Sequence, residues 1–447
     1  MSGPDLAYRR QFRRLYRMPL VSPRLWLRRI VFWLGAILVS LAAIGFARAA
    51  DVAVDAHRWI LDGRPWLTLL LAPATLAASL LLTRLFFPGA QGSGIPQVIA
   101  ALHLPGEAAI ARVLNLRLAA GKVLLTLLGL LGGASIGREG PTVQVGASIM
   151  FALGRRLRLP NDELRHALVL AGGAAGIAAA FNTPLAGVMF AIEELSHSFH
   201  ARTSGIVFTT VAIAGITALG ISGNYVYFGR TDATLAFGIA WLAVPLCGTV
   251  GGLLGGTFST ILLRAADGFP GRTGLFLARH PLLFAALCGL LIALLGLASG
   301  GTTYGTGYAE ARSIVEGHAH LPALFVPLKL AANVVSYISG IPGGIFAPSL
   351  AVGAGIGQWL SALVPTADGR AMVLLGMVAY FCGVVQAPIT ATLIVMEMTA
   401  NQAMTIPLMA ASFIAFGASR LVCRRPIYGA LAHRFQRAME RQEAGKT

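Results

Sequence analysis

The chain has 447 residues, of which 56% are apolar and 12% charged, and its formal net charge is +17. A soluble domain carries about a quarter charged residues, so this composition excludes intrinsic disorder and an ordinary soluble enzyme. Spanning a bilayer takes about 20 apolar residues per helix, and the sequence supplies about ten such stretches. We therefore predict an all-α polytopic membrane protein.

Positive charge gathers at the two ends of the chain. Residues 1–30 hold eight arginines against one aspartate, and residues 420–447 hold six arginines and one lysine against two glutamates. Basic residues mark cytoplasmic flanks, so both termini are predicted in the cytoplasm, where anionic lipid headgroups attract them. At these positions they favour a membrane surface over a nucleic acid as partner.

The apolar run from Ile30 to about Phe46 predicts the first transmembrane helix, led by a cytoplasmic amphipathic helix at residues 1–29. The run is longer than the core of a signal peptide, so no cleavage is expected. Residues 51–64 then face outward. At the other end, residues 431–447 are predicted to form a cytoplasmic tail. Only three lysines accompany 32 arginines, which favours a bacterial source and hence the bacterial inner membrane.

Four cysteines are scattered along the chain and show neither metal-ligand spacing nor a disulfide framework. We expect them to be packing residues and expect no metal site. They are Cys247, Cys288, Cys382 and Cys423.

The two halves of the chain repeat each other. Three blocks recur in the same order: Gly92–Val98 as Gly305–Ala311, Lys122–Pro141 as Lys329–Pro348, and Asn182–Glu193 as Gln386–Glu397. Ordered recurrence of this kind favours a duplicated transporter. The predicted membrane domain covers residues 30–430, with halves at about 30–228 and 236–430. The sequence leaves the relative orientation of the halves open.

Three Gly-rich blocks each end in a proline: Pro96, Pro141 and Pro348. Proline suits the first turn of a helix, and glycine allows close backbone approach. The blocks therefore predict three helix starts inside the membrane. Because helix N-termini carry unpaired N–H groups and partial positive charge, together they favour an anion site. The alternative is that these residues only kink and pack transmembrane helices.

Glu139 stands in the loop before the predicted helix start at Pro141. An intramembrane carboxylate is costly and is usually functional or paired. One interpretation is a local salt bridge with Arg138. The other is that the ionised carboxylate occupies the anion site itself and leaves when protonated, which would make it a gate and a proton carrier.

Glu193 and Glu194 lie near a membrane boundary, where a solvated or ion-paired helix end is the alternative to a function. Glu193 has a repeat partner in Glu397, which favours a structural role. Glu194 has none, since Met398 takes the corresponding place, and this favours a role that the second half lacks. Tyr428, taken alone, would be an interfacial anchor.

Catalysis and nucleotide-driven pumping are both disfavoured. Gly133–Gly137 fits the G-x-S-x-G pattern of a serine hydrolase, but an apolar run of transmembrane length precedes it where a strand is required. The chain shows no P-loop with a following Lys-Ser/Thr. We predict that the protein is not an enzyme; a membrane scaffold without anion flux is the alternative from another class.

At these residues the chain resembles the CLC family of chloride channels and chloride/proton antiporters. The family's signature segments correspond to Gly92-Ser93-Gly94-Ile95-Pro96, Gly137-Arg138-Glu139-Gly140-Pro141 and Gly344-Ile345-Phe346-Ala347-Pro348. The resemblance covers essentially residues 30–430. It implies two inverted-topology repeats with re-entrant or broken helices that meet at a central anion site. It also implies a homodimer with one pathway per subunit.

The resemblance assigns roles residue by residue. Ser93 and Tyr428 would supply hydroxyls to chloride, and the backbone amides of Ile345 and Phe346 would complete that site. Glu139 would be the external gate and proton acceptor. Glu194 matches the internal proton-transfer glutamate of antiporters, which favours coupled exchange of chloride and protons.

A passive voltage- or pH-gated chloride channel is the alternative within the family. Chloride and protons are the expected substrates, and no cofactor is expected. Ser93 in place of proline favours chloride over nitrate, and the motif forms disfavour the fluoride-exporting branch. Gln97 stands where close relatives often carry glutamate, and nucleotide regulation through cytoplasmic CBS domains is not expected.

Overall fold

The computed structural model describes residues 23–157, 162–196, 201–268 and 270–444. Within these ranges the chain folds into helices joined by short irregular segments, with two isolated β-bridges. Most of the predicted amphipathic segment 1–29 lies outside the described residues. The first described helix, α2, begins at Pro23 and continues without a break through the predicted transmembrane run.

The first half is built from successive helices that cross or enter the core of the molecule. They are α2 (Pro23–Leu61), η1 (Pro65–Leu67), α3 (Thr68–Phe86), α4 (Ile95–His103), α5 (Gly106–Val113), α6 (Leu116–Leu131), α7 (Glu139–Arg156), α8 (Asp162–Phe181), α9 (Pro184–Phe190), a π-helical turn η2 (Ala191–Ser196) and α10 (Ala201–Ser222).

The second half follows after an irregular connection at residues 223–238. Its helices are η3 (Ile239–Leu242), α11 (Ala243–Ala266), α12 (Gly271–Arg279), α13 (Pro281–Ala298), α14 (Tyr308–Val315), α15 (Phe325–Ile338), α16 (Phe346–Ser361), α17 (Gly369–Val385), α18 (Pro388–Thr399), α19 (Thr405–Val422) and α20 (Ile427–Ala444).

Among the described residues, eight helices are long and apolar enough to cross a membrane, and three shorter apolar helices accompany them. The apolar stretches of the sequence predict about ten crossings of about 20 residues each. The number is lower because several apolar segments are divided into helices that start inside the molecule. Helix α4, for example, has nine residues, less than half the length needed to span a bilayer.

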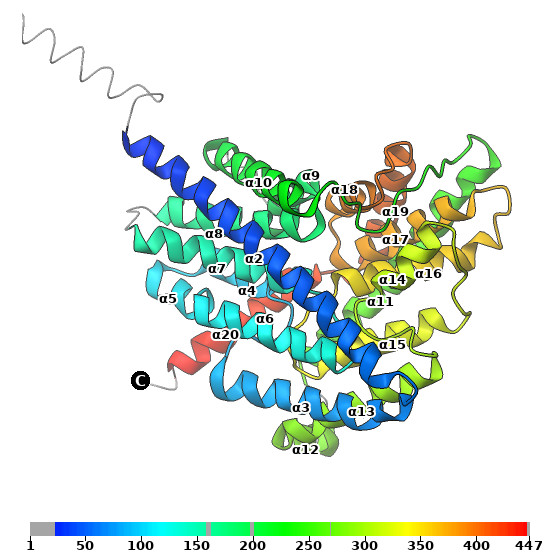
Figure 1. Ribbon diagram of the computed structural model, residues 1–447, viewed down its shortest axis with the longest axis horizontal. Coiled ribbons are helices and arrows are strands. Elements are labelled where there is room, and N and C mark those ends of the chain that lie inside the picture. Colours follow the sequence, from blue (N-terminus) through cyan, green and yellow to red (C-terminus); the bar gives the residue numbers. More distant parts are fainter. Residues whose placement is uncertain (1–22, 158–161, 197–200, 269, 445–447) are drawn as a thin grey trace, which may run out of the picture.

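The two halves lie side by side, the first coloured blue to green and the second green to orange (Figure 1). Each contains the same tight helix crossing. Gly146 of α7 and Gly172 of α8 stand so close that an added Cβ on either would collide with the other's carbonyl oxygen. Gly353 of α16 and Gly376 of α17 repeat this contact, which confirms the predicted structural repeat.

Gly137 and Gly344 are equivalent residues of the two halves. Each donates its amide to the other's carbonyl, at 2.7 and 2.8 Å, in an antiparallel bridge. Equivalent segments that pair with each other in opposite directions are related by a two-fold rotation. The halves are therefore inverted relative to each other, which settles the orientation that the sequence left open.

Helix α20 (red in Figure 1) returns from the second half to pack against α4 of the first. Gln436 Nε2 donates to the carbonyl of Ala100 at 3.3 Å, and Arg434 pairs with Asp267, the residue that follows α11, at 2.8 Å. The helix passes position 430, the predicted end of the membrane domain, so residues 431–444 of the predicted tail are helical. This packing carries Tyr428 into the centre.

Candidate functional site

Three Gly-rich loops from distant parts of the chain meet at the centre of the molecule. Gly92 donates its amide to the carbonyl of Ile341 at 3.3 Å and accepts from the amide of Gly343 at 3.1 Å. Ser93 packs directly against the backbone of Gly140, where even a Cβ would collide with its hydroxyl. The starts of α4, α7 and α16 thus converge, and their unpaired first-turn amides with them.

The three prolines lie in the first turns of these helices, as the sequence predicts. One detail differs. Helix α7 begins at Glu139, two residues before Pro141, so Glu139 is the first helical residue and not part of the preceding loop. Proline lacks an N–H and is tolerated where no intrahelical acceptor is available, so its position bounds a helix start only to within a turn.

Ser93 and Tyr428 both lie at this centre. They are 1% and 0% exposed, and neither hydroxyl has a hydrogen-bond partner in the described protein. Tyr428 stands in the first turn of α20, with its hydroxyl near that of Ser93 and within electrostatic range of both Glu139 and Glu194. A buried hydroxyl without a partner is costly, so both hydroxyls are available to a bound anion.

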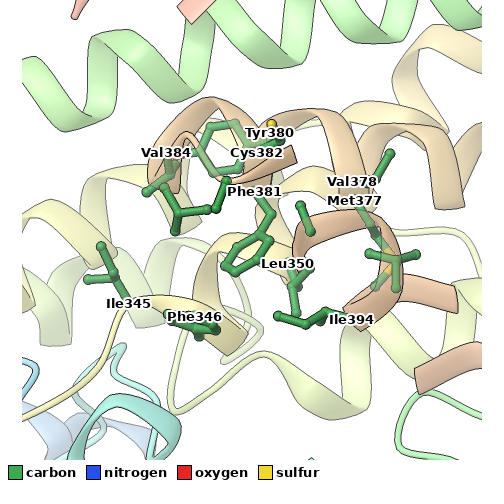
Figure 2. Close-up of a cluster of buried hydrophobic side chains, with 14 of the residues drawn as sticks. Ile345, Phe346, Leu350, Met377, Val378, Tyr380, Phe381, Cys382, Val384 and Ile394 are labelled. Atoms are coloured by element: carbon green, nitrogen blue, oxygen red, sulfur yellow. The ribbon is translucent and has the colours of Figure 1, made fainter. Parts of the chain in front are cut away.

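Ile345 and Phe346 open α16 and are almost fully buried (Figure 2). The Phe346 ring stacks on Tyr428 with centroids 6.0 Å apart and meets Phe381 edge-on at 4.8 Å. This aromatic packing anchors the first turn of α16. Its amides stay available because a helix supplies no internal acceptor for them.

The Glu139 side chain is fully buried. Its Oε1 accepts a hydrogen bond from the Tyr227 hydroxyl at 3.4 Å, while Oε2 folds back against Gly137 and has no partner in the described residues. The amide of Ala347, in the first turn of α16, also interacts with the carboxylate. The carboxylate therefore lies where two helix N-termini provide positive potential.

Arg138 does not form the local salt bridge that was the alternative for Glu139. Its guanidinium pairs with Asp51 of α2 at 2.7 Å and also donates to the carbonyl of Ala47. Consecutive side chains thus point in different directions. Helix α2 extends to Leu61, so Asp51 is helical and holds Arg138 while remaining two-thirds exposed.

Glu194 is 2% exposed, and its Oε1 has no partner in the described residues. It lies in the π-helical turn η2, a rare geometry that is frequent at functional sites. Neighbouring Glu193 points elsewhere and accepts hydrogen bonds from the amides of Ile389 and Thr390, at 3.2 and 2.7 Å, at the start of α18. The two adjacent glutamates therefore have different surroundings, as their unequal repeat partners indicate.

Two residues of this site are not among the predicted ones. Tyr227 lies in the connection between the halves, and no local motif marks it. Lys122 served only as a marker of the repeat; its buried ammonium donates to the carbonyls of Gln91 and Gly92, at 3.3 and 2.9 Å, and so anchors the loop that carries Ser93. A lysine within an apolar run is the signal that would have found it.

Lys329 performs the equivalent task in the second half. Its buried ammonium donates to the carbonyls of Thr303 and Gly305, both at 2.9 Å. The side-chain amide of Gln97 supports the first loop further, with Nε2 donating to the carbonyl of Gln91 at 2.7 Å. Because their carbonyls accept these hydrogen bonds, the backbones of the two loops are held in place.

The fold defines a helical membrane protein of two inverted repeats, in which helix N-termini meet buried hydroxyl and carboxyl groups. The family model described as voltage gated chloride channel matches residues 74–420, and the chain belongs to this family. The described residues contain no group of three or more His, Cys, Asp or Glu side chains that could hold a metal ion.

Individual relatives agree with this assignment. The chain is 34% identical to the "H(+)/Cl(-) exchange transporter ClcA" of Cronobacter sakazakii, over 92% of this chain and 90% of that one. It is 32% identical to the protein of the same name from Vibrio parahaemolyticus, over 83% and 80%. A solved structure titled as a slow cyanobacterial Cl-/H+ antiporter superposes with a TM-score of 0.79 at 25% identity, covering 92% of this chain and 98% of that one.

Proposed function

We propose that this protein exchanges chloride for protons across the membrane. The proposal rests on four buried side chains, each with a polar atom that has no hydrogen-bond partner among the described residues. They are Ser93, Glu139, Glu194 and Tyr428. Two of the groups offer hydroxyl donors to an anion, and two can carry a proton. The exchange-transporter names of relatives at 32–34% identity support the same function.

Chloride in this proposal binds to the hydroxyls of Ser93 and Tyr428 and to the amides of Ile345 and Phe346. These donors carry partial charges, so chloride is stabilised enough to enter but not so strongly that it cannot leave. Lys122 lies behind the Ser93 loop, where its hydrogen bonds to the carbonyls of Gln91 and Gly92 hold the loop in place.

Glu139 acts as the external gate because its ionised carboxylate competes with chloride for the same positive potential at the helix N-termini. Protonation removes its charge and frees the path. Glu194 transfers protons between this region and the cytoplasm. Tyr428 is within electrostatic range of both carboxyl groups. The cycle uses no cofactor and forms no covalent intermediate.

We further propose a homodimer in the bacterial inner membrane, with both termini in the cytoplasm and one pathway in each subunit. A single chain supplies every group of the site described above, which supports a separate pathway per subunit. The basic residues at both ends support the orientation.

The test uses purified protein in chloride-loaded liposomes, with external pH and chloride efflux followed together. Chloride that leaves the liposomes down its gradient should drive protons inward against the proton gradient. The external pH should therefore rise. Glu194→Gln should abolish proton movement while chloride still flows. Chloride flux without proton movement in the wild-type protein would instead show the alternative, a passive channel, and no flux of either ion would contradict both.

A further inference from the structure

Tyr227 lies in the connection between the halves, yet it is only 2% exposed. The connection is tied to both halves around it. On one side, Asn182 Nδ2 donates to the carbonyl of Tyr225 at 3.1 Å; on the other, the amide of Phe228 donates to the carbonyl of Met398 at 2.8 Å. Residue 227 therefore has a fixed backbone between two anchored neighbours.

The ring of Tyr227 is enclosed as well. It meets Phe181, Phe228 and Tyr308 edge-on, with centroids 5.3, 4.9 and 4.8 Å apart. The guanidinium of Arg138 lies over it at 5.9 Å, held in place by Asp51. A ring packed on all these sides keeps one orientation, and in that orientation its hydroxyl reaches Glu139 Oε1.

We propose that Tyr227 is a positioning residue that holds the Glu139 carboxylate in the anion path and so sets how readily the gate opens. This inference rests on the proposed function. The enclosed phenol cannot follow the carboxylate when it moves, so the hydrogen bond stabilises only the closed position. A hydroxyl also favours an ionised acceptor over a protonated one, so the contact retards gate protonation.

Replacing Tyr227 by Phe keeps the ring and removes the donor. At 3.4 Å the hydrogen bond is long, so we expect its contribution to fall below the usual range for a charged acceptor. Chloride turnover at neutral pH should rise about fivefold, which corresponds to about 1 kcal/mol. Acid activation of the flux should also reach its midpoint at a higher pH, because the ionised gate has lost a donor.

The other groups that face Glu139 are unchanged in this variant. Arg138 stays paired with Asp51, and the hydroxyls of Tyr225 and Tyr428 remain within electrostatic range of Glu139. A shift in the pH profile therefore reports the lost contact. Tyr308→Phe is the matched control: it removes a hydroxyl from the same aromatic cluster, but one that contacts Arg312 at 2.9 Å instead of the gate.

The experiment measures chloride turnover and its pH profile in liposomes for wild type, Tyr227→Phe and Tyr308→Phe, each alone and combined with Glu139→Ala. The proposal requires that only Tyr227→Phe accelerates transport and that the acceleration vanishes without the Glu139 carboxylate. An equal acceleration in the Glu139→Ala background, or with Tyr308→Phe, would overturn it, as would unchanged kinetics. If wild type moves no chloride against protons, the proposed function fails and this inference with it.

Discussion

Glu193 of the first half caps the start of α18, and Glu397 of the second half caps the start of α9. Glu193, in the turn η2 that follows α9, accepts from the amides of Ile389 and Thr390 at the start of α18. Glu397, near the end of α18, accepts from the amides of Leu185 and Ala186 at the start of α9, at 3.1 and 2.8 Å. The reciprocal contacts show that α9 and α18 run antiparallel.

This arrangement predicts that substituting Glu193 lowers stability, whereas substituting the adjacent Glu194 abolishes proton coupling. Glu193→Gln leaves a single acceptor for two amides and should lower the free energy of unfolding by about 1–2 kcal/mol, the usual cost of losing a helix cap. Proton coupling should remain. Thermal unfolding in detergent and proton/chloride exchange in liposomes provide the two measurements.

Glu194→Gln is the matched variant, because it carries the same chemical change one residue further along the chain. It caps no helix in the described structure, so its unfolding temperature should stay near that of wild type while proton movement is lost. Loss of coupling in Glu193→Gln with Glu194→Gln still coupled would contradict the assignment of these two residues.

Removing the charge of Glu139 should abolish the pH dependence of chloride flux. In wild type, lower external pH protonates the gate, so chloride flux should increase as the medium is acidified. Glu139→Gln carries no titratable group at this position, and its flux should be nearly independent of pH and uncoupled from protons. Chloride efflux measured at several external pH values tests this; a variant that keeps the wild-type pH profile would place the gate elsewhere.

The two buried lysines give a matched pair for chloride affinity. Lys122→Met leaves the carbonyls of Gln91 and Gly92 without their donor and loosens the loop that bears Ser93, so chloride affinity should fall about tenfold, or about 1.4 kcal/mol. Lys329→Met removes the same support from the Gly305 loop, which carries no proposed chloride ligand. Calorimetric titration with chloride should show normal affinity there, despite a comparable loss of thermal stability.

Replacing Gln97 by glutamate, the residue that close relatives often carry here, should lower the free energy of unfolding. Its Nε2 donates to the carbonyls of Gln91 and Gly89 at 2.7 and 3.5 Å, and a carboxylate would replace this donor with a negative charge facing two acceptors. The ammonium of Lys122, which donates to the same Gln91 carbonyl, offsets only part of this cost. Gln97→Glu should destabilise folding by about 1–3 kcal/mol. Gln97→Met, which removes the donor without adding charge, should cost less; equal unfolding temperatures for the glutamate variant and wild type would refute the argument.

The comparison of sequence and structure is clearest at the helix starts. Pro96, Pro141 and Pro348 lie in first turns as predicted, because proline and glycine act through local backbone geometry. The start of α7 at Glu139 differs from the predicted start at Pro141, since the terminal turns of a helix depend on what packs against them.

The partners of Arg138 and Glu139, by contrast, could not be predicted from the sequence. Asp51 is 87 residues from Arg138 in sequence, and Tyr227 is 88 residues from Glu139. Nothing in the spacing of these residues indicates the pairing. Each contact follows from how α2 and the connection between the halves lie over the start of α7.

By itself, the sequence determined the membrane-spanning class and the duplication, because apolar run length and recurrence are properties of the chain. The roles proposed for Ser93, Glu139, Glu194 and Tyr428 rest on its resemblance to the family. The tertiary structure decided the inverted orientation of the halves, the diversion of Arg138 to Asp51 and the contact of Tyr227 with the gate. These depend on which backbones can approach closely. That is set by packing between segments distant in sequence, at contacts such as Gly146 with Gly172 and Gly353 with Gly376.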